Sequence, residues 1–437
     1  MKLKSTVTLP AVALSGFETP LSEEEQAIQG TVHRFAKDVL RPLGQELDKM
    51  TAEQVIAPGS PYYTVFAEAA KLGLDSSLLQ QLPPEMAIRV ESMIHEEMGW
   101  GDVGLGISLA VATFPSEMAK AADKQELVDL CTGKIGCWMI TQPDKGSDVQ
   151  IFDMQKEWAV KGGQGNKGNV WGKVGADEIV INGQCSAWVS NGAVAQVALA
   201  YIGADYGDGF FEADGRPNGL VVIIPLDLPG VSKGRPLDKI GQRPLPQGEI
   251  FFDNVKIPKR FAIALRDEYY GNFASTWSFA GCLMGQVMTG LSRAAFEMAL
   301  QYCHERRQGG QLLIEHQLTR YRIGDMLRRV ELCRAVARRT LAYSRLSPAG
   351  HPYVTASGKV TVTDEAMRIA TDALQLFGAA GTSREYPIEK LFRDARAAQI
   401  EDGENYVLTM RLGILAQQLF ADGWSQSSWL AQPEFNR

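Results

Sequence analysis

Two adjacent carboxylates near the C-terminus are the residues of this chain best suited to proton transfer. Glu401 and Asp402 precede a glycine in the stretch "QIEDGENYVL". A carboxylate held at a fixed place can remove a proton from carbon when its surroundings match its pKa to that task. The alternative interpretation of the same letters is an exposed acidic turn with no chemical role.

Two further stretches carry side chains that suit a flat ligand with polar edges. "WMITQPDKGSDV" predicts a strand that ends in a turn, where Thr141 and Ser147 offer hydroxyl groups. In "GQCSAWVSNG" we expect Trp188 and Ser190 on one face of a strand, because alternate residues of a strand share a face. Taken singly, the first stretch is also typical of a surface turn and the second of a buried core tryptophan.

Two stretches in the last third of the chain suit a phosphate-bearing ligand. Arg306 precedes a pair of glycines in "ERRQGGQLLIEHQ", and Gln317 closes that stretch. A guanidinium group is a planar, permanently charged donor that matches a pyrophosphate. In "QLFGAAG", Gln375 and Gly378 lie where a helix is expected to end, and glycine there allows close backbone approach. A solvated helix end is the alternative interpretation of the arginine.

Composition excludes several classes of protein. The chain has 437 residues, 22% of them charged, with a formal net charge of −7, which does not favour nucleic-acid binding. No run of about 20 apolar residues predicts a membrane span. The dispersed six cysteines and five histidines predict free thiols and no metal site. The opening residues lack a convincing signal peptide, so we expect a cytoplasmic protein.

The texture of the sequence changes twice along the chain. Helical periodicity dominates from about residue 21 to 122, short β-branched and aromatic runs follow up to about 258, and long amphipathic stretches return from 273. These changes predict a mainly α protein with a central β domain. We expect domains at residues 1–132, 133–262 and 263–437.

Five motifs in this order resemble the acyl-CoA dehydrogenase family over nearly the whole chain. They are "MITQPDKGSDV", "AWVSNG", "LDKIGQRPLPQGEIFFDNVKIP", "ERRQGGQLLIEHQ" and "QLFGAAGTSREYPIEKLFRDARAAQIEDG". The resemblance implies an N-terminal helical domain, a middle β-barrel-like domain and a C-terminal four-helix bundle. It also implies that FAD lies between the β domain and the bundle, in a homodimer or homotetramer whose subunits share the FAD sites.

The resemblance also implies a reaction. Family members remove an α proton from an acyl-CoA thioester while a hydride leaves the β carbon for flavin N5, and an electron-transfer flavoprotein accepts the electrons. Asp402 stands where many members have a glutamate base, and Glu401 replaces a tyrosine. The aspartate is one methylene shorter and loses about 1.5 Å of reach, so Glu401 turning inward stays open as an alternative base.

The cofactor contacts implied by the resemblance divide into two sets. The set at the isoalloxazine is Ile140, Thr141, Trp188 and Ser190, with Ser147 near FAD or substrate. The set at the ADP half is Arg306 and Gln317, with Gln375 and Gly378 from a neighbouring subunit.

Several departures from the family pattern keep other functions open. Ser278 and Gly281 replace the family's aspartate and arginine that contact CoA, and Ala280 leaves no carboxylate at a second base position on that helix. Nitroalkane oxidase, in the same superfamily, uses an aspartate base and no CoA, and its glycine-pair segment is similar to this one. Its arginine after the aspartate is matched here only by Arg411, two places late. A non-catalytic, DNA-binding flavin homologue is a further alternative, which the negative net charge does not favour.

Overall fold

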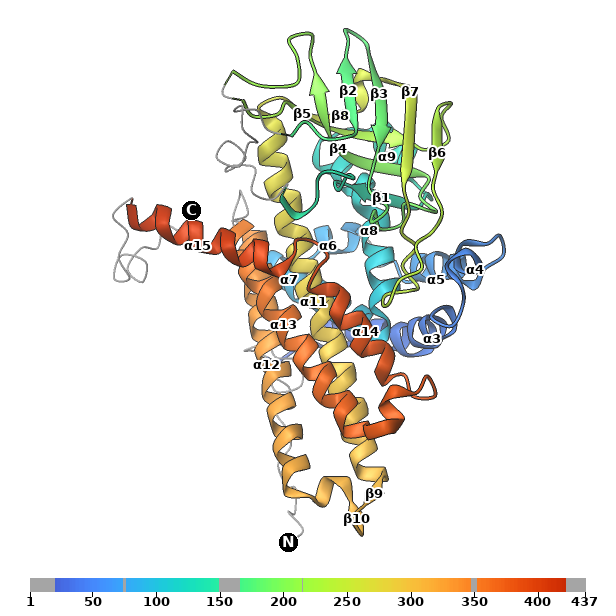
Figure 1. The fold of residues 1–437 in the computed structure, drawn as a ribbon, viewed down its shortest axis with the longest axis vertical. Helices are drawn as coiled ribbons and strands as arrows, with labels where there is room; N and C mark the ends of the chain where they lie inside the picture. Colours follow the sequence, from blue (N-terminus) through green and yellow to red (C-terminus); the bar gives the residue numbers. More distant parts are fainter. Residues whose placement is uncertain (1–19, 74–75, 149–165, 214, 347–351, 422–437) are drawn as a thin grey trace.

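The computed structural model describes residues 20–73, 76–148, 166–213, 215–346 and 352–421. Strands occupy one end of an elongated molecule, and long helices run from them to the opposite end (Figure 1). The opening segment, in which we expect no signal peptide, lies outside the described residues. Among the helices of the described ranges, none is long and apolar enough to cross a membrane.

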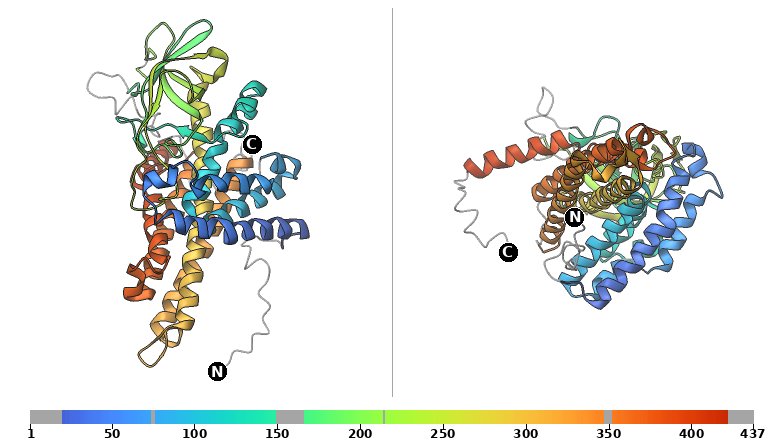
Figure 2. Two further views of the ribbon diagram at one scale, coloured as in Figure 1. Left: turned by 90° about the vertical axis from the view of Figure 1, so that its right-hand side faces the viewer. Right: turned by 90° about the horizontal axis from the view of Figure 1, so that it is seen from below.

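The N-terminal third is helical, as predicted, and lies on one side of the long helices (Figure 2). Its first helix begins in a capping box between Ser22 and Glu25. Asp102 ends α7 and caps α8, where its carboxylate accepts the Leu105 N–H at 2.9 Å. The helices are α2 (Glu23–Phe35), α3 (Arg41–Leu47), α4 (Ala52–Ile56), α5 (Thr64–Lys71), α6 (Ser76–Gln81), α7 (Pro84–Gly101), α8 (Val103–Ala121) and α9 (Gln125–Cys131).

The middle third forms an eight-stranded sheet in the order β6-β7-β3-β2-β4-β5-β8, and β1 pairs in parallel with β4. Both faces of β4 and β5 are buried, which explains their continuous apolar runs. The strands are β1 (Gly136–Met139), β2 (Trp171–Val174), β3 (Glu178–Gln184), β4 (Val197–Asp205), β5 (Gly219–Pro225), β6 (Val231–Lys233), β7 (Ile250–Pro258) and β8 (Ala262–Leu265).

The last third is a helical bundle built around α11, which packs against α7, α12, α13 and α14. Gly290 lets α11 cross α7 closely, because a Cβ at this position would lie 2.0 Å from the Glu96 carbonyl oxygen. A short hairpin of β9 (Arg307–Gln308) and β10 (Gln311–Leu312) lies at the end of the bundle opposite the large sheet (Figure 1). The helices are α11 (Glu268–Glu305), α12 (Gln317–Leu346), α13 (Pro352–Phe377), α14 (Ile388–Ala398) and α15 (Asn405–Ala421).

Candidate active site

The two carboxylates singled out from the sequence lie in the turn between α14 and α15. The backbone of Asp402 is left-handed at φ +50°, and Gly403 follows at φ +98°. A non-glycine residue in this region is uncommon, and its surroundings must hold it there. The Trp277 indole N–H donates to the Asp402 carbonyl oxygen at 3.4 Å, and the Glu404 N–H donates to the Ser147 hydroxyl oxygen at 2.9 Å.

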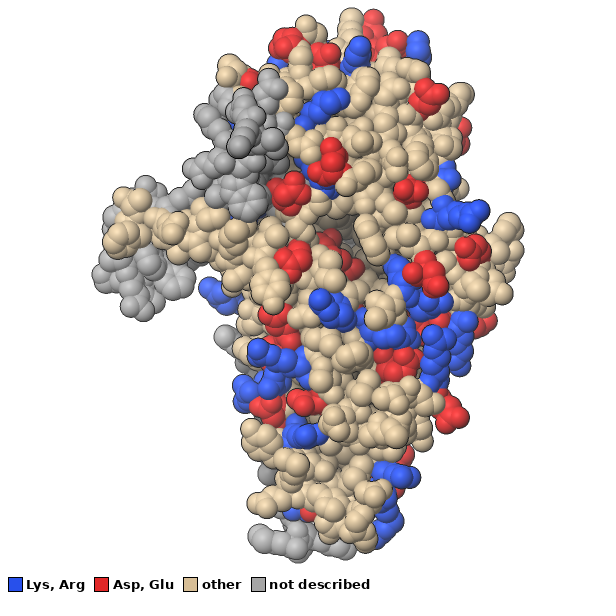
Figure 3. Space-filling model, in the orientation of Figure 1, with Lys and Arg blue, Asp and Glu red and all other residues tan. Residues whose placement is uncertain are grey.

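The contact between Glu404 and Ser147 joins two motifs that are far apart in the sequence. The stretch "MITQPDKGSDV", which by the family resemblance contacts the flavin and is here called the flavin loop, therefore lies directly against the turn that carries Asp402. The Ser147 hydroxyl accepts the Glu404 N–H and keeps its own hydrogen to donate. Figure 3 shows a hollow where the strands meet the bundle, with acidic atoms at its mouth.

Glu401 faces a loop that precedes β7. The Gln242 side chain donates to the Glu401 carboxylate, and the Gln242 backbone N–H donates to Asp394. The loop rests on α14, where Arg393 donates to the Ile240 carbonyl oxygen at 2.7 Å. Gly241 is required at this contact, since a Cβ would lie 2.3 Å from the Arg393 carbonyl oxygen. The "RDAR" motif therefore positions the partner of Glu401.

Burial shifts the proton affinities of the groups around this turn. It raises the pKa of Asp402 to about 6, against a lowering effect of the Lys359 ammonium. Burial and the neighbouring Asp402 charge raise the pKa of Glu401 to about 7. Burial also lowers the pKa of Lys239 to about 7, although Glu401 and Asp394 oppose this. Two adjacent carboxyl groups that titrate near neutral pH can exchange protons with a substrate.

The structure brings the four residues of the predicted isoalloxazine set into neighbouring segments. Ile140 and Thr141 directly follow β1, and the Thr141 carbonyl oxygen accepts the Ser186 N–H at 2.9 Å. Trp188 and Ser190 lie beyond this contact, where the Gln247 side chain donates to the Trp188 carbonyl oxygen at 3.0 Å. The Trp188 side chain is 61% exposed, so its ring is open to a planar ligand.

The expectation that Trp188 and Ser190 share a strand is wrong. β3 ends at Gln184, and Trp188 lies in a turn. The Ser186 hydroxyl oxygen accepts the Trp188 N–H at 3.1 Å, a local contact that competes with a strand ladder. Ser190 forms only an isolated bridge with Gln247.

The predicted ADP set lies at the opposite end of the bundle. Arg306 follows the last residue of α11, and Gln317 begins α12. Gln375 lies in the last turn of α13, and Gly378 follows that helix at φ +60°. Tyr302 of α11 stacks on Phe377 of α13 with ring centroids 4.0 Å apart, so the C-terminal ends of these two helices lie side by side. All four predicted residues are exposed.

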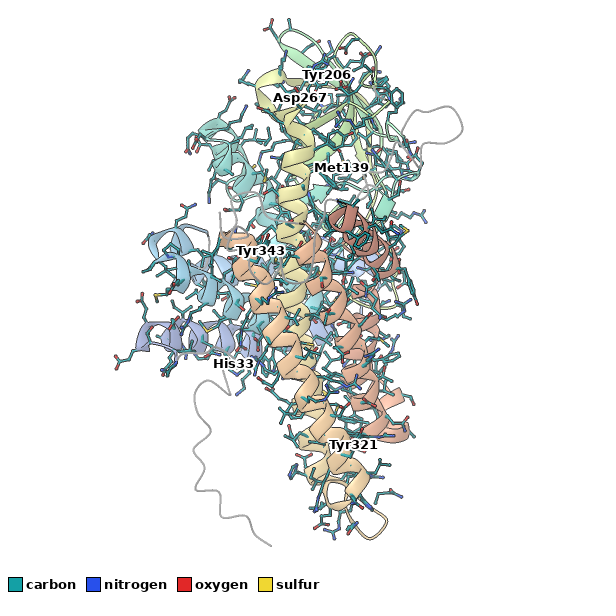
Figure 4. All side chains as sticks on the ribbon, turned by 90° about the vertical axis from the view of Figure 1, so that its left-hand side faces the viewer. His33, Met139, Tyr206, Asp267, Tyr321 and Tyr343 are labelled. Atoms are coloured by element: carbon teal, nitrogen blue, oxygen red, sulfur yellow. The ribbon has the colours of Figure 1, made fainter. Side chains whose placement is uncertain are left out.

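A long helix separates the two predicted sets. α11 has 38 residues and extends about 57 Å at 1.5 Å per residue. Trp277 contacts the Asp402 turn near the start of α11, so Arg306 lies roughly 40 Å away along the axis. Figure 4 shows this separation, with Met139 beside the strands and Tyr321 near the far end of the bundle. Because the isoalloxazine set and the ADP set lie this far apart, one chain cannot place both of them on the same dinucleotide.

Sequence reasoning missed several polar residues around the turn. Lys359 is 1% exposed on α13, yet its ammonium lies under the turn, 2.7 Å from the Gly403 carbonyl oxygen. Gln242 and Lys239 lie inside a motif whose role the letters alone do not show. The signal for Lys359 was a polar stripe of Thr355, Lys359 and Thr363 at four-residue spacing, which places all three on one helix face.

Comparison with known proteins agrees with this architecture. Residues 137–255 match the family described as acyl-CoA dehydrogenase, middle domain, and residues 281–419 match acyl-CoA dehydrogenase, C-terminal domain. Glutaryl-CoA dehydrogenase of Desulfococcus multivorans is 28% identical, with 90% of this chain and 96% of that protein covered. Cyclohexane-1-carbonyl-CoA dehydrogenase of Geobacter metallireducens is 29% identical, with 88% of this chain and 95% of that protein covered.

A solved structure supports the fold. Butyryl-CoA dehydrogenase of Megasphaera elsdenii superimposes with a TM-score of 0.75 at 21% identity, over 92% of this chain and 100% of that one. The predicted fold class is confirmed. The chain belongs to the acyl-CoA dehydrogenase family, whose members are flavin-dependent oxidoreductases.

Proposed function

We propose that this protein binds FAD and catalyses α,β-dehydrogenation of an acyl-CoA thioester, with Asp402 removing the α proton. The observation that carries the proposal is the contact of Ser147 with Glu404, which unites the flavin loop with the turn of Asp402. The relatives named above act on acyl-CoA thioesters by name. Bound FAD would supply the acceptor for the β hydride and pass electrons to an electron-transfer flavoprotein.

The residues of this chain suit the base chemistry. Asp402 is partly buried, and its pKa near 6 leaves it ionised at neutral pH while it remains basic enough to take a proton. The left-handed turn and the contacts from Trp277 and Ser147 hold the backbone that carries the carboxylate in one place. A fixed base matters here, because misplacement by about 1 Å costs on the order of a hundredfold in rate. Glu401, whose carboxyl group accepts from Gln242, has the higher pKa of about 7 and would hold its proton to a higher pH than Asp402 does.

The two predicted contact sets fit FAD only when a second copy of the chain takes part. Trp188 offers an open aromatic face, and the left-handed backbone of Gly378 leaves open space for a phosphate-bearing group. The four residues of the ADP set lie together, so a copy that supplies Gln375 and Gly378 would also supply Arg306 and Gln317. We therefore propose that the functional unit is a pair of subunits, in either a homodimer or a homotetramer. The cytoplasmic location of the protein stays a prediction.

A second candidate function is a CoA-independent flavin oxidase of the nitroalkane-oxidase type. The observation that favours it lies on α11, where Ser278 is fully buried and Gly281 faces Thr355 of α13. Neither residue carries a charge like those of the aspartate and arginine with which the family contacts CoA. A buried Asp402 base serves this chemistry equally well.

Anaerobic bleaching of the bound flavin separates the two functions. The purified flavoprotein is mixed with a panel of straight-chain, branched, cyclic and dicarboxylic acyl-CoAs, and separately with nitroalkanes. Bleaching by a thioester supports the dehydrogenase. Bleaching by nitroalkanes alone would support the oxidase, and bleaching by neither would contradict both.

A further inference from the structure

The Asp402 turn is fastened to α13 by a buried network. Lys359 donates from its ammonium to the Gly403 carbonyl oxygen at 2.7 Å and to the Asn405 side-chain oxygen at 2.8 Å. Asn405 in turn donates to the Thr363 hydroxyl at 3.0 Å and to the Asp364 carboxylate at 2.8 Å. Asp364 also accepts from the Gln399 side chain at 2.7 Å. One face of α13 therefore holds both ends of the turn.

Lys359 is also the charged group best placed to act on Asp402. It is 1% exposed, and both contacts described for its ammonium are to neutral oxygens. Among the ion pairs of the described residues, none joins Lys359 directly to Asp402. Its positive charge therefore acts on the carboxylate through space and does not occupy the oxygens that must accept a substrate proton. At low local dielectric such a charge is felt strongly.

We propose that Lys359 is a positioning residue that makes Asp402, and not Glu401, the ionised member of the carboxyl pair. This rests on the proposed function, in which Asp402 is the base. On the other side of the pair, Glu401 accepts from the neutral amide of Gln242. The nearby ammonium of Lys239 donates to the Leu245 carbonyl oxygen and to the Gln247 side chain. Lys359 also lowers the pKa of Glu401, but there it acts after Gln242 and Lys239, whereas at Asp402 it is the one cation that lowers the pKa.

The remaining charged groups around Lys359 fit this role. Asp402, Glu401, Glu404 and Asp364 all raise the pKa of Lys359, while burial lowers it to about 8. The lysine therefore remains protonated at neutral pH. Arg411 of α15 lies over the Trp277 ring, with its guanidinium carbon 5.0 Å from the ring centroid. Among the causes of the Asp402 shift, Lys359 is the cation that lowers its pKa.

The test uses three substitutions that separate charge from hydrogen bonding. Lys359→Gln removes the charge and retains a hydrogen-bond donor, whereas Lys359→Arg retains the charge. Thr363→Val removes the hydroxyl that accepts from Asn405 and so weakens the buried network while leaving Lys359 in place. The pH dependence of flavin bleaching by the best acyl-CoA is measured for each. We expect Lys359→Gln to raise the pKa of the acidic limb by about 1 unit or more, as loss of a nearby opposite charge does. Lys359→Arg and Thr363→Val should slow bleaching but leave the pKa of the acidic limb unchanged.

A second readout does not depend on turnover. Thermal unfolding of the wild type, Asp402→Asn, Lys359→Gln and the double variant is followed between about pH 5 and 9, and the difference made by Asp402→Asn reports the carboxyl pKa in each background. We expect that pKa to be higher in the Lys359→Gln background. An equal pKa in both backgrounds, or an equal shift from Lys359→Arg and Lys359→Gln, would overturn the inference. If no acyl-CoA bleaches the wild type, the proposed function fails and this second readout still decides the role of Lys359.

Discussion

The turn around Asp402 and the far end of the bundle contrast sharply, although each carries a set of predicted functional residues. At the turn, contacts from α11, α13 and the flavin loop fix the backbone within one chain. At the far end, Arg306, Gln317, Gln375 and Gly378 are exposed. The difference supports the proposal that one chain builds the site of proton transfer, whereas a second copy of the chain completes the FAD site.

The largest expected effect is that of Asp402→Asn. The amide cannot accept the α proton, yet nothing at the distant ADP set changes. We expect flavin content to be retained and the rate of bleaching by acyl-CoA to fall at least about a hundredfold, within the range attributed to general bases. Near-normal bleaching would exclude Asp402 as the base and point to Glu401.

Arg306→Ala tests the opposite end. Loss of a charged hydrogen bond to a phosphate, on the order of 1.5–3 kcal/mol, should weaken FAD retention by roughly ten- to a hundredfold. Flavin content after gel filtration measures this. Arg328→Ala is the matched control, because Arg328 is another exposed arginine of the bundle, paired with Asp325 at 2.7 Å. A fully flavinated Arg306→Ala protein would remove the ADP role from this end.

Ser147→Ala tests the contact that joins the two motifs. Removing the acceptor of the Glu404 N–H leaves a partly buried donor without its partner and frees one side of the turn, at a cost of about 1 kcal/mol. We expect bleaching to slow by about tenfold with flavin retained. Ser357→Ala, on the exposed face of α13, serves as control. Equal rates for the two variants would show that the contact does not position Asp402.

Glu401→Gln should have the smallest effect, on stability. The pKa of Glu401 is raised in the folded protein from 4.5 to about 7, so its contribution to stability is present below about pH 4.5 and lost as pH rises through 7. Gln resembles the protonated form. We expect the variant to melt as the wild type does in acid and to be more stable above pH 7, by about 1–2 kcal/mol since Glu401 is partly exposed. A variant less stable than the wild type at pH 8 would contradict the raised pKa of Glu401.

Part of this picture could be predicted from the sequence, for identifiable reasons. The order of helices, strands and helices follows from periodicity, and the Asp402 turn from its glycine and its flanking helices. Trp188 was misplaced because aromatic and β-branched residues indicate a strand, whereas Ser186 accepts the Trp188 N–H and favours a turn. Lys359 was missed because a lysine on an amphipathic helix is usually solvated, and its burial here depends on tertiary packing, in which the turn of Gly403 lies over its ammonium.

The central claim is that Asp402 removes the α proton during flavin reduction. The most direct measurement is the kinetic isotope effect on anaerobic flavin bleaching with an α-dideuterated acyl-CoA, followed across pH. A large isotope effect, with a rate that rises with pH through a pKa near 6 and is lost in Asp402→Asn, is the predicted result. A rate without an isotope effect that does not change with pH in this range would contradict it.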